Sequence, residues 1–466
     1  MLAAACGQYP NVHRRAQVQA ELAGVASPTG GPAGGTEPGG TSDATPSPSP
    51  EPTGASGSDA GSPAGSAPTS GAPTSEPTNS VVPSEKGALG DEAAVGQNTG
   101  SSKIWGDTLV IGVHAPITGS APVQFFSLEQ EKALYWRYGS DLRPVRIAGR
   151  SLQVVLRDDR NDPSAAVDAC RELATKDHAF LVIGISGPAQ VAGCARFAQR
   201  AGVPYLSLGA AQRPLAGLGN YFALSETYAQ QTPSLVTYLK RTYTRECGRM
   251  LMVTSRSASV DDAVRAFRKA CRGAKVERVP ASGAPETVGS RLCAGDARTH
   301  RVVYPLVDPR FFLQMARAAR SCAPPFVGVG VTMGLDGVAD AFCRHGGRTG
   351  ELRSLSPAPA FADALRFDSG FERAAEAARV PPDDLGWLLW GMSRSVGALL
   401  EQTGSQLSRH AFIQTASTAS VSVDGFGRLQ FSPSNHFGGR AFSLLSTICS
   451  GGTGHYRTLR ANVSGL

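Results

Sequence analysis

The first hundred residues contain almost no aromatic or large aliphatic side chains. From about residue 25 to residue 102 the sequence is mostly Gly, Pro, Ser, Thr and Ala. Such a segment cannot bury enough apolar surface to offset the entropy lost on ordering. We therefore expect residues 1–23 to be followed by a disordered Pro/Ser/Gly linker at 24–102 and a globular domain at 103–456.

The sequence has no CxxC pair, and its histidines do not cluster near its cysteines, which argues against a zinc site. Nine cysteines are present, and setting Cys6 aside leaves an even eight in the later domain. An even set of this kind favours disulfides and an oxidising compartment. The eight are Cys170, Cys194, Cys247, Cys271, Cys293, Cys322, Cys343 and Cys449.

The chain lacks basic runs with interleaved aromatic residues, so we expect no nucleic-acid partner. Its net charge is +7; residues 24–102 contribute −7 and residues 1–23 contribute +1, which leaves +13 for residues 103–466. A charge of this sign and size suits an acidic partner or an anionic envelope polymer.

The usual sequence signatures of α/β enzymes are also missing. Residues 184–188 read GISGP, which is not the G-x-S-x-G of a nucleophile elbow, and the late glycines at 328–334 do not fit a dinucleotide fingerprint. Asp158 and Asp159 are adjacent on a strand and should point to opposite faces. His114 and Glu226 have no visible partner in the sequence. We therefore expect no enzyme activity, no catalytic residue, no cofactor and no metal.

From Asp107 onward short apolar strands alternate with amphipathic helices, and the pattern occurs twice. This order predicts two α/β lobes, each a doubly wound, Rossmann-like parallel sheet. We assign residues 107–227 and 357–420 to lobe 1 and residues 228–356 and 421–456 to lobe 2. The expected helices lie at about 127–139, 164–177, 188–202, 232–243, 260–273, 286–294, 310–322, 338–343, 371–378, 383–403 and 406–416, and the segment 420–433 is expected to form a β-ribbon.

The opening residues LAAACG resemble the end of a bacterial lipoprotein signal, in which small residues precede a cysteine that accepts diacylglycerol. The charged and long apolar parts of a signal are missing, and an upstream start codon would supply them. A long linker between this cysteine and a globular domain suits a surface anchor. We therefore expect Cys6 to be lipidated and to hold the protein on the extracytoplasmic face of the cell membrane.

Ligands of open α/β sheets bind beyond the carboxyl ends of the strands. We therefore expect the loops that follow the strands of both lobes to form a cleft. Ser186 and Gly187 also precede a helix, where free N–H groups accept a carboxylate. The candidate ligand-binding residues are Pro116, Thr118, Ser186, Gly187, Gly209, Ala210, Ala211, Asp308, Thr332 and Met333.

Several segments resemble the type I solute-binding proteins of ABC importers, in the leucine/isoleucine/valine-binding class. They are IGVHAPITG, RDDRNDPSAAV, LVIGISGPAQVAGCARFAQRAGVPYLSLGA, NYFAL and FDSGFERA. The resemblance spans about residues 105–456. It implies two lobes joined by a three-strand hinge, which close on a small molecule and deliver it to a membrane permease.

The ligand residues of that class carry over only in part. Ser186 or its neighbour matches the serine that grips the amino-acid head group. The class has Gly-Ala-Thr after the fourth strand, whereas this chain has Gly209-Ala210-Ala211 and lacks the threonine hydroxyl. The second lobe shows no clear match to the usual aromatic residue and acid.

The resemblance thus favours a monomeric solute-binding lipoprotein of an ABC importer that binds an amino-acid-like or other small polar metabolite. The alternatives are a surface sensor or interaction module with the same fold and, less favoured, an α/β enzyme.

The eight domain cysteines allow about a hundred pairings, among which sequence alone does not choose. Cys170 and Cys194 lie on consecutive expected helices that flank the third strand, so we predict a disulfide between them. Cys247 with Cys271 is the next candidate. The pairs Cys293–Cys322 and Cys343–Cys449 follow only by elimination.

Overall fold

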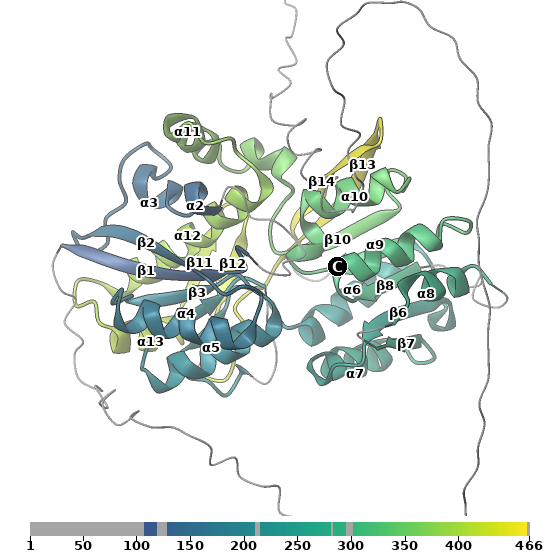
Figure 1. Ribbon diagram of the computed structural model, residues 1–466, viewed down its shortest axis with the longest axis horizontal. Helices are drawn as coiled ribbons and strands as arrows, with labels where there is room; N and C mark the ends of the chain where they lie inside the picture. Colours follow the sequence, from purple (N-terminus) through teal and green to yellow (C-terminus); the bar gives the residue numbers. More distant parts are fainter. Residues whose placement is uncertain (1–106, 119–127, 210–214, 281–282, 295–301, 464–466) are drawn as a thin grey trace, which may run out of the picture. The chain divides into compact units, whose positions relative to one another are not determined.

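The computed structural model describes residues 107–118, 128–209, 215–280, 283–294 and 302–463. The expected linker and the expected lipidation site at Cys6 lie outside these residues. The described residues fold as two α/β lobes (Figure 1), which confirms the predicted fold class. Among them, no helix is both long and apolar enough to cross a membrane.

Lobe 1 has a five-stranded, entirely parallel sheet with the strand order β2-β1-β3-β4-β5. Helices α4 and α5 cover one face of this sheet, and α12 and α13 pack on the other. The strands are β1 (Thr108–Ala115), β2 (Ser151–Asp158), β3 (Leu181–Gly184), β4 (Tyr205–Ser207) and β5 (Tyr221–Ala223). The helices are α2 (Leu128–Glu131), α3 (Leu134–Tyr138), α4 (Pro163–Thr175), α5 (Pro188–Arg200), α11 (Ser369–Ala378), α12 (Asp384–Thr403) and α13 (Arg409–Ala416).

Lobe 2 repeats this topology in its parallel strands and adds two antiparallel strands at one edge. Its sheet order is β14-β13-β10-β9-β8-β6-β7. The strands are β6 (Met250–Ser255), β7 (Lys275–Val279), β8 (Val302–Leu306), β9 (Phe326–Val329), β10 (Leu352–Ser356), β13 (Phe442–Ser450) and β14 (Thr453–Val463). The helices are α6 (Tyr228–Thr242), α7 (Asp261–Ala270), α8 (Pro285–Leu292), α9 (Pro309–Ala318) and α10 (Asp336–Arg344).

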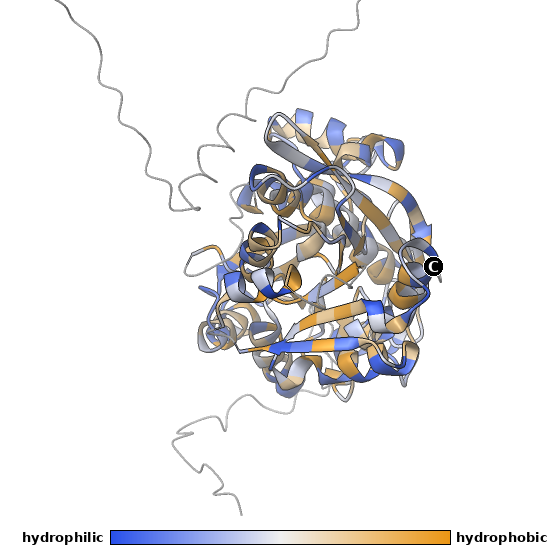
Figure 2. Cartoon of the chain, turned by 90° about the vertical axis from the view of Figure 1, so that its right-hand side faces the viewer, coloured by the Kyte–Doolittle hydropathy of each residue, from blue (hydrophilic) through white to orange (hydrophobic). Residues whose placement is uncertain are grey.

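Alternation along the strands builds two apolar layers in lobe 2. Met250 and Met252 pack with α6 and α7, whereas Leu251 and Val253 face α8, α9 and α10. Apolar residues follow the strands, and hydrophilic residues lie on the outer parts of the helices (Figure 2). Burial on both faces explains why these strands read as continuous apolar runs.

Three segments connect the lobes, as the family resemblance implied: residues 224–227, 357–360 and 431–441. The first and third run together, because the Ala223 N–H donates to the His436 carbonyl at 2.9 Å and the Gly438 N–H donates to the Ala223 carbonyl at 2.8 Å. A Cβ on Gly439 would lie 2.9 Å from the Ser225 Cα. Glycine at this position therefore lets two backbones cross in contact.

The ribbon β11 (Ser420–Val423) and β12 (Gly427–Gln430) packs with lobe 1, although we assigned residues from 421 onward to lobe 2. Its inward side chains, Val421 and Leu429, join the apolar cluster of α12 and the first sheet. Lobe 2 takes up the chain again only at Phe442, where β13 begins.

Three other details of the expected elements were wrong. The helix expected at 127–139 is broken into α2 and α3. Helix α6 begins at Tyr228 instead of 232, because Thr227 and Gln230 form a capping box there. Strands β10, β13 and β14 were not predicted. The last of these is a polar edge strand without an apolar run.

The four disulfides pair the cysteines as predicted. Their Cα–Cα distances are 5.8 Å for Cys170–Cys194, 5.3 Å for Cys247–Cys271, 5.3 Å for Cys293–Cys322 and 5.4 Å for Cys343–Cys449. The first joins α4 to α5, and the second joins the end of α7 to the turn before β6. Each disulfide therefore ties neighbouring elements within one lobe.

Candidate functional site

The carboxyl ends of β1 and β3 lie side by side in lobe 1, at the point where the strand order reverses direction. Pro116 and Thr118 follow β1, and Ser186 and Gly187 follow β3. The structure thus brings these four predicted residues to adjacent strand ends. In open α/β sheets this is the place where ligands bind.

The two adjacent aspartates at the end of β2 serve different partners, as their alternation predicted. Asp158 Oδ1 accepts from the backbone N–H groups of Ile117 at 3.0 Å and Thr118 at 3.2 Å, and the Thr118 hydroxyl donates to Oδ2. Partial burial alone would raise the Asp158 pKa, but these bonds, with one from Arg160, outweigh it and hold the pKa below its ordinary value. Asp158 thus fixes the loop that carries Thr118.

Asp159 points the other way, into a chain of polar side chains that is buried except at Ser186. His114 Nδ1 lies 2.8 Å from Asp159 Oδ2, and His114 Nε2 lies 2.7 Å from the Tyr205 hydroxyl. The Ser186 hydroxyl donates to the same Asp159 oxygen. Asp159, His114 and Tyr205 have no exposed surface. We call Ser186, Asp159, His114 and Tyr205 the lobe 1 polar chain.

Gly184 makes this chain possible. His114 is on β1 and Tyr205 is on β4, so their hydrogen bond passes over β3, which lies between them. A Cβ on Gly184 would lie 1.9 Å from the Tyr205 hydroxyl and 2.8 Å from His114 Nε2. Only glycine leaves room for the bond at this position.

The chemistry of the polar chain fixes what Ser186 can offer. Burial, with the neighbouring Tyr221 and Asp159, raises the Tyr205 pKa well above its ordinary value, so the phenol stays protonated and can donate to His114 Nε2. The other ring nitrogen of His114, Nδ1, faces the Asp159 carboxylate. Because the Ser186 hydroxyl donates its hydrogen bond to Asp159, its oxygen can only accept a hydrogen bond from a ligand at the strand end.

The start of α5 offers the complementary donors. Its N-cap residue is Gly187, which has no side chain to cap the first turn, whereas Asp162 caps α4 and Thr227 caps α6. The first-turn N–H groups of a 13-residue helix carry partial positive charge. Pro188, the first residue of α5, has no N–H, so the backbone donors are those of Gly187, Ala189 and Gln190, within four residues of the Ser186 oxygen.

The predicted residues of lobe 2 are placed less uniformly. Asp308 follows β8 and is exposed, with its carboxylate capping α9 through the Arg310 N–H at 2.8 Å. Thr332 is exposed in a short turn after β9, but Met333 is 5 % exposed and packs in the core of lobe 2. The structure thus leaves Asp308 and Thr332 at the surface and turns Met333 inward. Ala210 and Ala211 lie outside the described residues.

Strand-end loops of the two lobes approach each other. A Cβ on Gly209, after β4, would lie 2.9 Å from a Val331 methyl carbon, after β9. Val331 and Leu335 pack with the apolar cluster of lobe 1, and the Asp336 N–H donates to Asp384 of α12 at 2.7 Å. The carboxyl ends of both sheets therefore contribute to one region.

Sequence reasoning missed the role of His114, Asp159 and Tyr205, and it was wrong that His114 and Glu226 lack partners. Glu226 Oε1 lies 3.7 Å from Arg440 of the third connecting segment. Burial raises the Glu226 pKa, and Arg440 partly offsets this effect. No sequence signal indicates these pairs, because 45 residues separate His114 from Asp159 and 91 separate it from Tyr205.

Where side chains that could bind a metal ion lie close together, their donor atoms already have other partners. Among the described residues, His114, Cys170 and Cys194 form the one group of metal-ligand types whose donor atoms lie within 4.8 Å of one another. Both cysteines are joined in a disulfide, and both ring nitrogens of His114 are hydrogen bonded. These residues do not fit a metal.

The chain matches the sequence model of the periplasmic binding protein family over residues 108–452. A search of curated proteins finds no match. Among solved structures, the solute-binding protein of an ABC transporter from Rhodopseudomonas palustris BisB5, in complex with 3,4-dihydroxybenzoic acid, has a TM-score of 0.60 at 16 % identity, covering 78 % of this chain and 98 % of that one.

A branched-chain amino acid transporter substrate-binding protein from Streptococcus pneumoniae, in complex with isoleucine, has a TM-score of 0.59 at 16 % identity, covering 76 % of this chain and 99 % of that one. At such identities the likeness shows the fold alone. The family match, however, spans both lobes and most of the chain. The chain therefore belongs to the periplasmic binding protein family.

Proposed function

We propose that this chain is the extracytoplasmic solute-binding protein of an ABC importer, and that it binds a small amino-acid-like or related polar carboxylate between its lobes. One observation carries the proposal: an acceptor oxygen on Ser186 and the uncapped start of α5 lie together at the strand-order reversal of lobe 1. The α5 N–H groups suit a carboxylate, and the Ser186 oxygen beside Asp159 suits an ammonium or hydroxyl donor.

Thr118, Gly187 and Gly209 complete the lobe 1 side of the proposed site, and Asp308 and Thr332 are the proposed contacts from lobe 2. Asp158 holds Thr118 in place. Gly209 lies against Val331, so the two sides of the proposed site already meet at this point. The two similar structures hold 3,4-dihydroxybenzoic acid and isoleucine, and both of these ligands carry a carboxylate.

The remaining parts of the proposal concern the cell. We place the protein on the outer face of the membrane, held by a lipid on Cys6, as a monomer that meets a membrane permease. The eight domain cysteines, all paired in disulfides, support an oxidising compartment. A sensor with the same fold would share every one of these features except the permease.

Ligand identity and site are tested together. Mass spectrometry of small molecules released from the purified protein names the ligand, and calorimetry then compares wild type with Ser186→Ala. Because closure would leave a ligand donor unpaired, we expect affinity to fall roughly 5- to 150-fold. Ser405→Ala, an exposed serine between α12 and α13, is the control and should bind as wild type does. Equal affinity in both variants would remove Ser186 from the site, and chemical turnover of the ligand would overturn the binding-protein proposal.

A further inference from the structure

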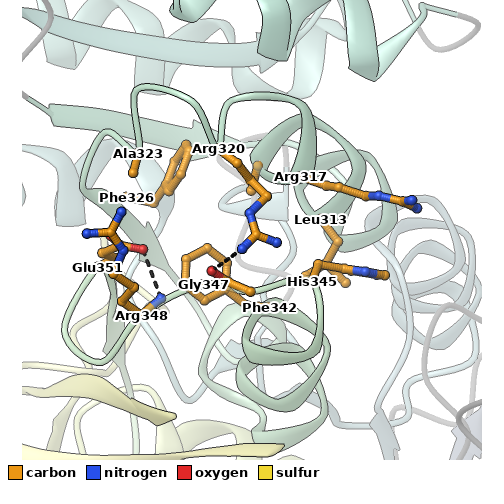
Figure 3. A pocket seen from close by; sticks show the side chains of 12 residues that line it. Leu313, Arg317, Arg320, Ala323, Phe326, Phe342, His345, Gly347, Arg348 and Glu351 are labelled. Carbon is orange, nitrogen blue, oxygen red and sulfur yellow. Dashed lines mark hydrogen bonds and ion pairs between the residues drawn. The ribbon is translucent and has the colours of Figure 1, made fainter. Parts of the chain in front are cut away.

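A pocket lies in lobe 2, at the starting ends of its parallel strands. Its floor is aromatic, formed by Phe326 and Phe342, and its rim carries three arginines and a histidine (Figure 3). The arginines are Arg317, Arg320 and Arg348, and the histidine is His345. We call this the lobe 2 basic pocket.

This pocket is separate from the proposed ligand site. Phe326 is the first residue of β9 and Glu351 immediately precedes β10, whereas Val331 and Thr332 follow the other end of β9. A strand of four residues spans about 13 Å. A ligand in the lobe 2 basic pocket would therefore not reach the loops of the cleft.

The positive charge of the pocket is not balanced within the described residues. Arg348 pairs with Glu351 at 3.3 Å, the one carboxylate among the lining residues. Neither Arg317 nor Arg320 has a carboxylate within ion-pair distance in the part of the chain that the structure describes. Arg320 is held by the Gly346 carbonyl at 2.5 Å. Two guanidinium groups thus remain available to an outside anion.

The backbone is shaped to keep the pocket in place. A Cβ on Gly346 would lie 1.6 Å from an Arg320 guanidinium nitrogen, and a Cβ on Gly347 would lie 2.1 Å from the Phe342 ring. The glycine pair therefore lets the loop approach both the central arginine and the aromatic floor. Positive side chains at the carboxyl ends of α9 and α10 also interact favourably with the helix dipoles. That interaction does not explain why Arg348 and the glycine pair are present.

We infer that the lobe 2 basic pocket binds a phosphate group. Arg317 and Arg320 supply forked donors of the kind that recognise phosphate oxygens, and His345 lies beside Arg317 (Figure 3). The apolar floor would contact the carbon atoms of a phosphate ester. The group could belong to a free phosphate ester or to the headgroup of an anionic lipid, and the experiment below separates the two.

Burial and the charges of Arg317, Arg344 and Arg320 lower the His345 pKa, so the imidazole is neutral near pH 7 in the unoccupied pocket. A bound phosphate would supply the opposite charge that this histidine lacks. Binding should therefore raise the His345 pKa, which NMR of the ring protons can follow.

The test is equilibrium dialysis of the full chain, without its lipid, against radiolabelled inorganic phosphate. We expect a dissociation constant on the order of 0.1–1 mM for a few charge-assisted contacts, and a loss of about tenfold or more in Arg317→Gln and Arg320→Gln. Arg320→Lys should fall between, because it keeps the charge and loses the fork. Arg317 has no partner among the described residues to lose, so its variant tests binding without disturbing the loop.

Arg344→Gln is the matched control. It removes the same charge one residue from the pocket, but its guanidinium pairs with Asp340 at 3.1 Å and does not line the pocket. Wild-type affinity in this control and weak binding in the two pocket variants would support the inference. No phosphate binding at 10-fold above the expected dissociation constant, or equal losses in all variants, would overturn it.

Vesicles identify the source of the phosphate group. If it belongs to a lipid, vesicles containing phosphatidylglycerol should sediment the wild-type chain but not Arg317→Gln, and phosphatidylcholine vesicles should sediment neither. If it belongs to a soluble ester, dialysis shows binding and neither vesicle does. Ser186→Ala should keep phosphate affinity, so a failed cleft proposal and a failed pocket inference give different results.

Discussion

The substitution Gly184→Ala should damage lobe 1 through one added methyl group. The new Cβ would lie 1.9 Å from the Tyr205 hydroxyl and 2.8 Å from His114 Nε2, inside a region with no exposed surface. The Tyr205 ring or the β3 backbone must move, and the bond between Tyr205 and His114 is lost. Overpacking costs about 1–3 kcal/mol and the lost bond about 1 kcal/mol, so we expect about 2–4 kcal/mol of destabilisation.

Urea unfolding, followed by tryptophan fluorescence and circular dichroism, measures this loss. Gly219→Ala is the matched control, because a Cβ there meets nothing within 4 Å and the residue does not have a left-handed φ. The control should unfold at the wild-type midpoint or slightly above it. Equal midpoints for the two alanine variants would refute the reasoning.

A double-mutant cycle isolates the contact itself. Tyr205→Phe removes the hydroxyl that the new methyl would strike, so the pair Gly184→Ala with Tyr205→Phe should be less destabilised than the sum of the single variants. Strict additivity would show that Gly184→Ala acts through something other than the polar chain. Since Ser186 donates to the same chain, Gly184→Ala should also weaken binding of the cleft ligand.

Two further predictions concern pH and the anchor. Burial lowers the His436 pKa below its ordinary value of 6.5, although its bonds to the Tyr221 and Leu218 carbonyls oppose this effect. The folded protein therefore disfavours the imidazolium, and the free energy of unfolding should fall as pH drops below 6.5. His436→Gln should flatten that decline in urea titrations between pH 5 and pH 7.5, and an unchanged slope would contradict the assignment. When the chain is expressed behind a complete lipoprotein signal, Cys6→Ala should move the protein from the membrane fraction to the medium, and retention in the membrane would exclude a lipid on Cys6.

Local chemistry explains most of what could be predicted from the sequence. Apolar runs such as LVIG at 181–184 predict buried parallel strands, and Asp162 followed by Pro163 marks the start of α4. The even set of cysteines on neighbouring helices predicts the Cys170–Cys194 disulfide. These signals are local or depend on the order of elements, so they can be read without coordinates.

The elements that the sequence did not predict correctly depend on contacts with distant parts of the chain. The polar edge strand β14 lacks an apolar pattern, and it is a strand because it pairs with β13. The ribbon of β11 and β12 packs on lobe 1 because α12, from an earlier part of the chain, offers an apolar surface there. Neither fact is encoded in the segment itself.

The candidate sites also combine features that the sequence predicts with features that only tertiary contacts create. The sequence by itself placed Ser186 and Gly187 at a strand end before a helix, because strand–helix order fixes which loops lie at the carboxyl edge. Only the tertiary structure decided that Ser186 is an acceptor, since Asp159, His114 and Tyr205 come from three other segments. Likewise, Arg320 and Gly346 become one pocket only when α9 and the loop after α10 meet, because a hydrogen bond between residues 26 apart depends on how the helices pack and not on their spacing in the sequence.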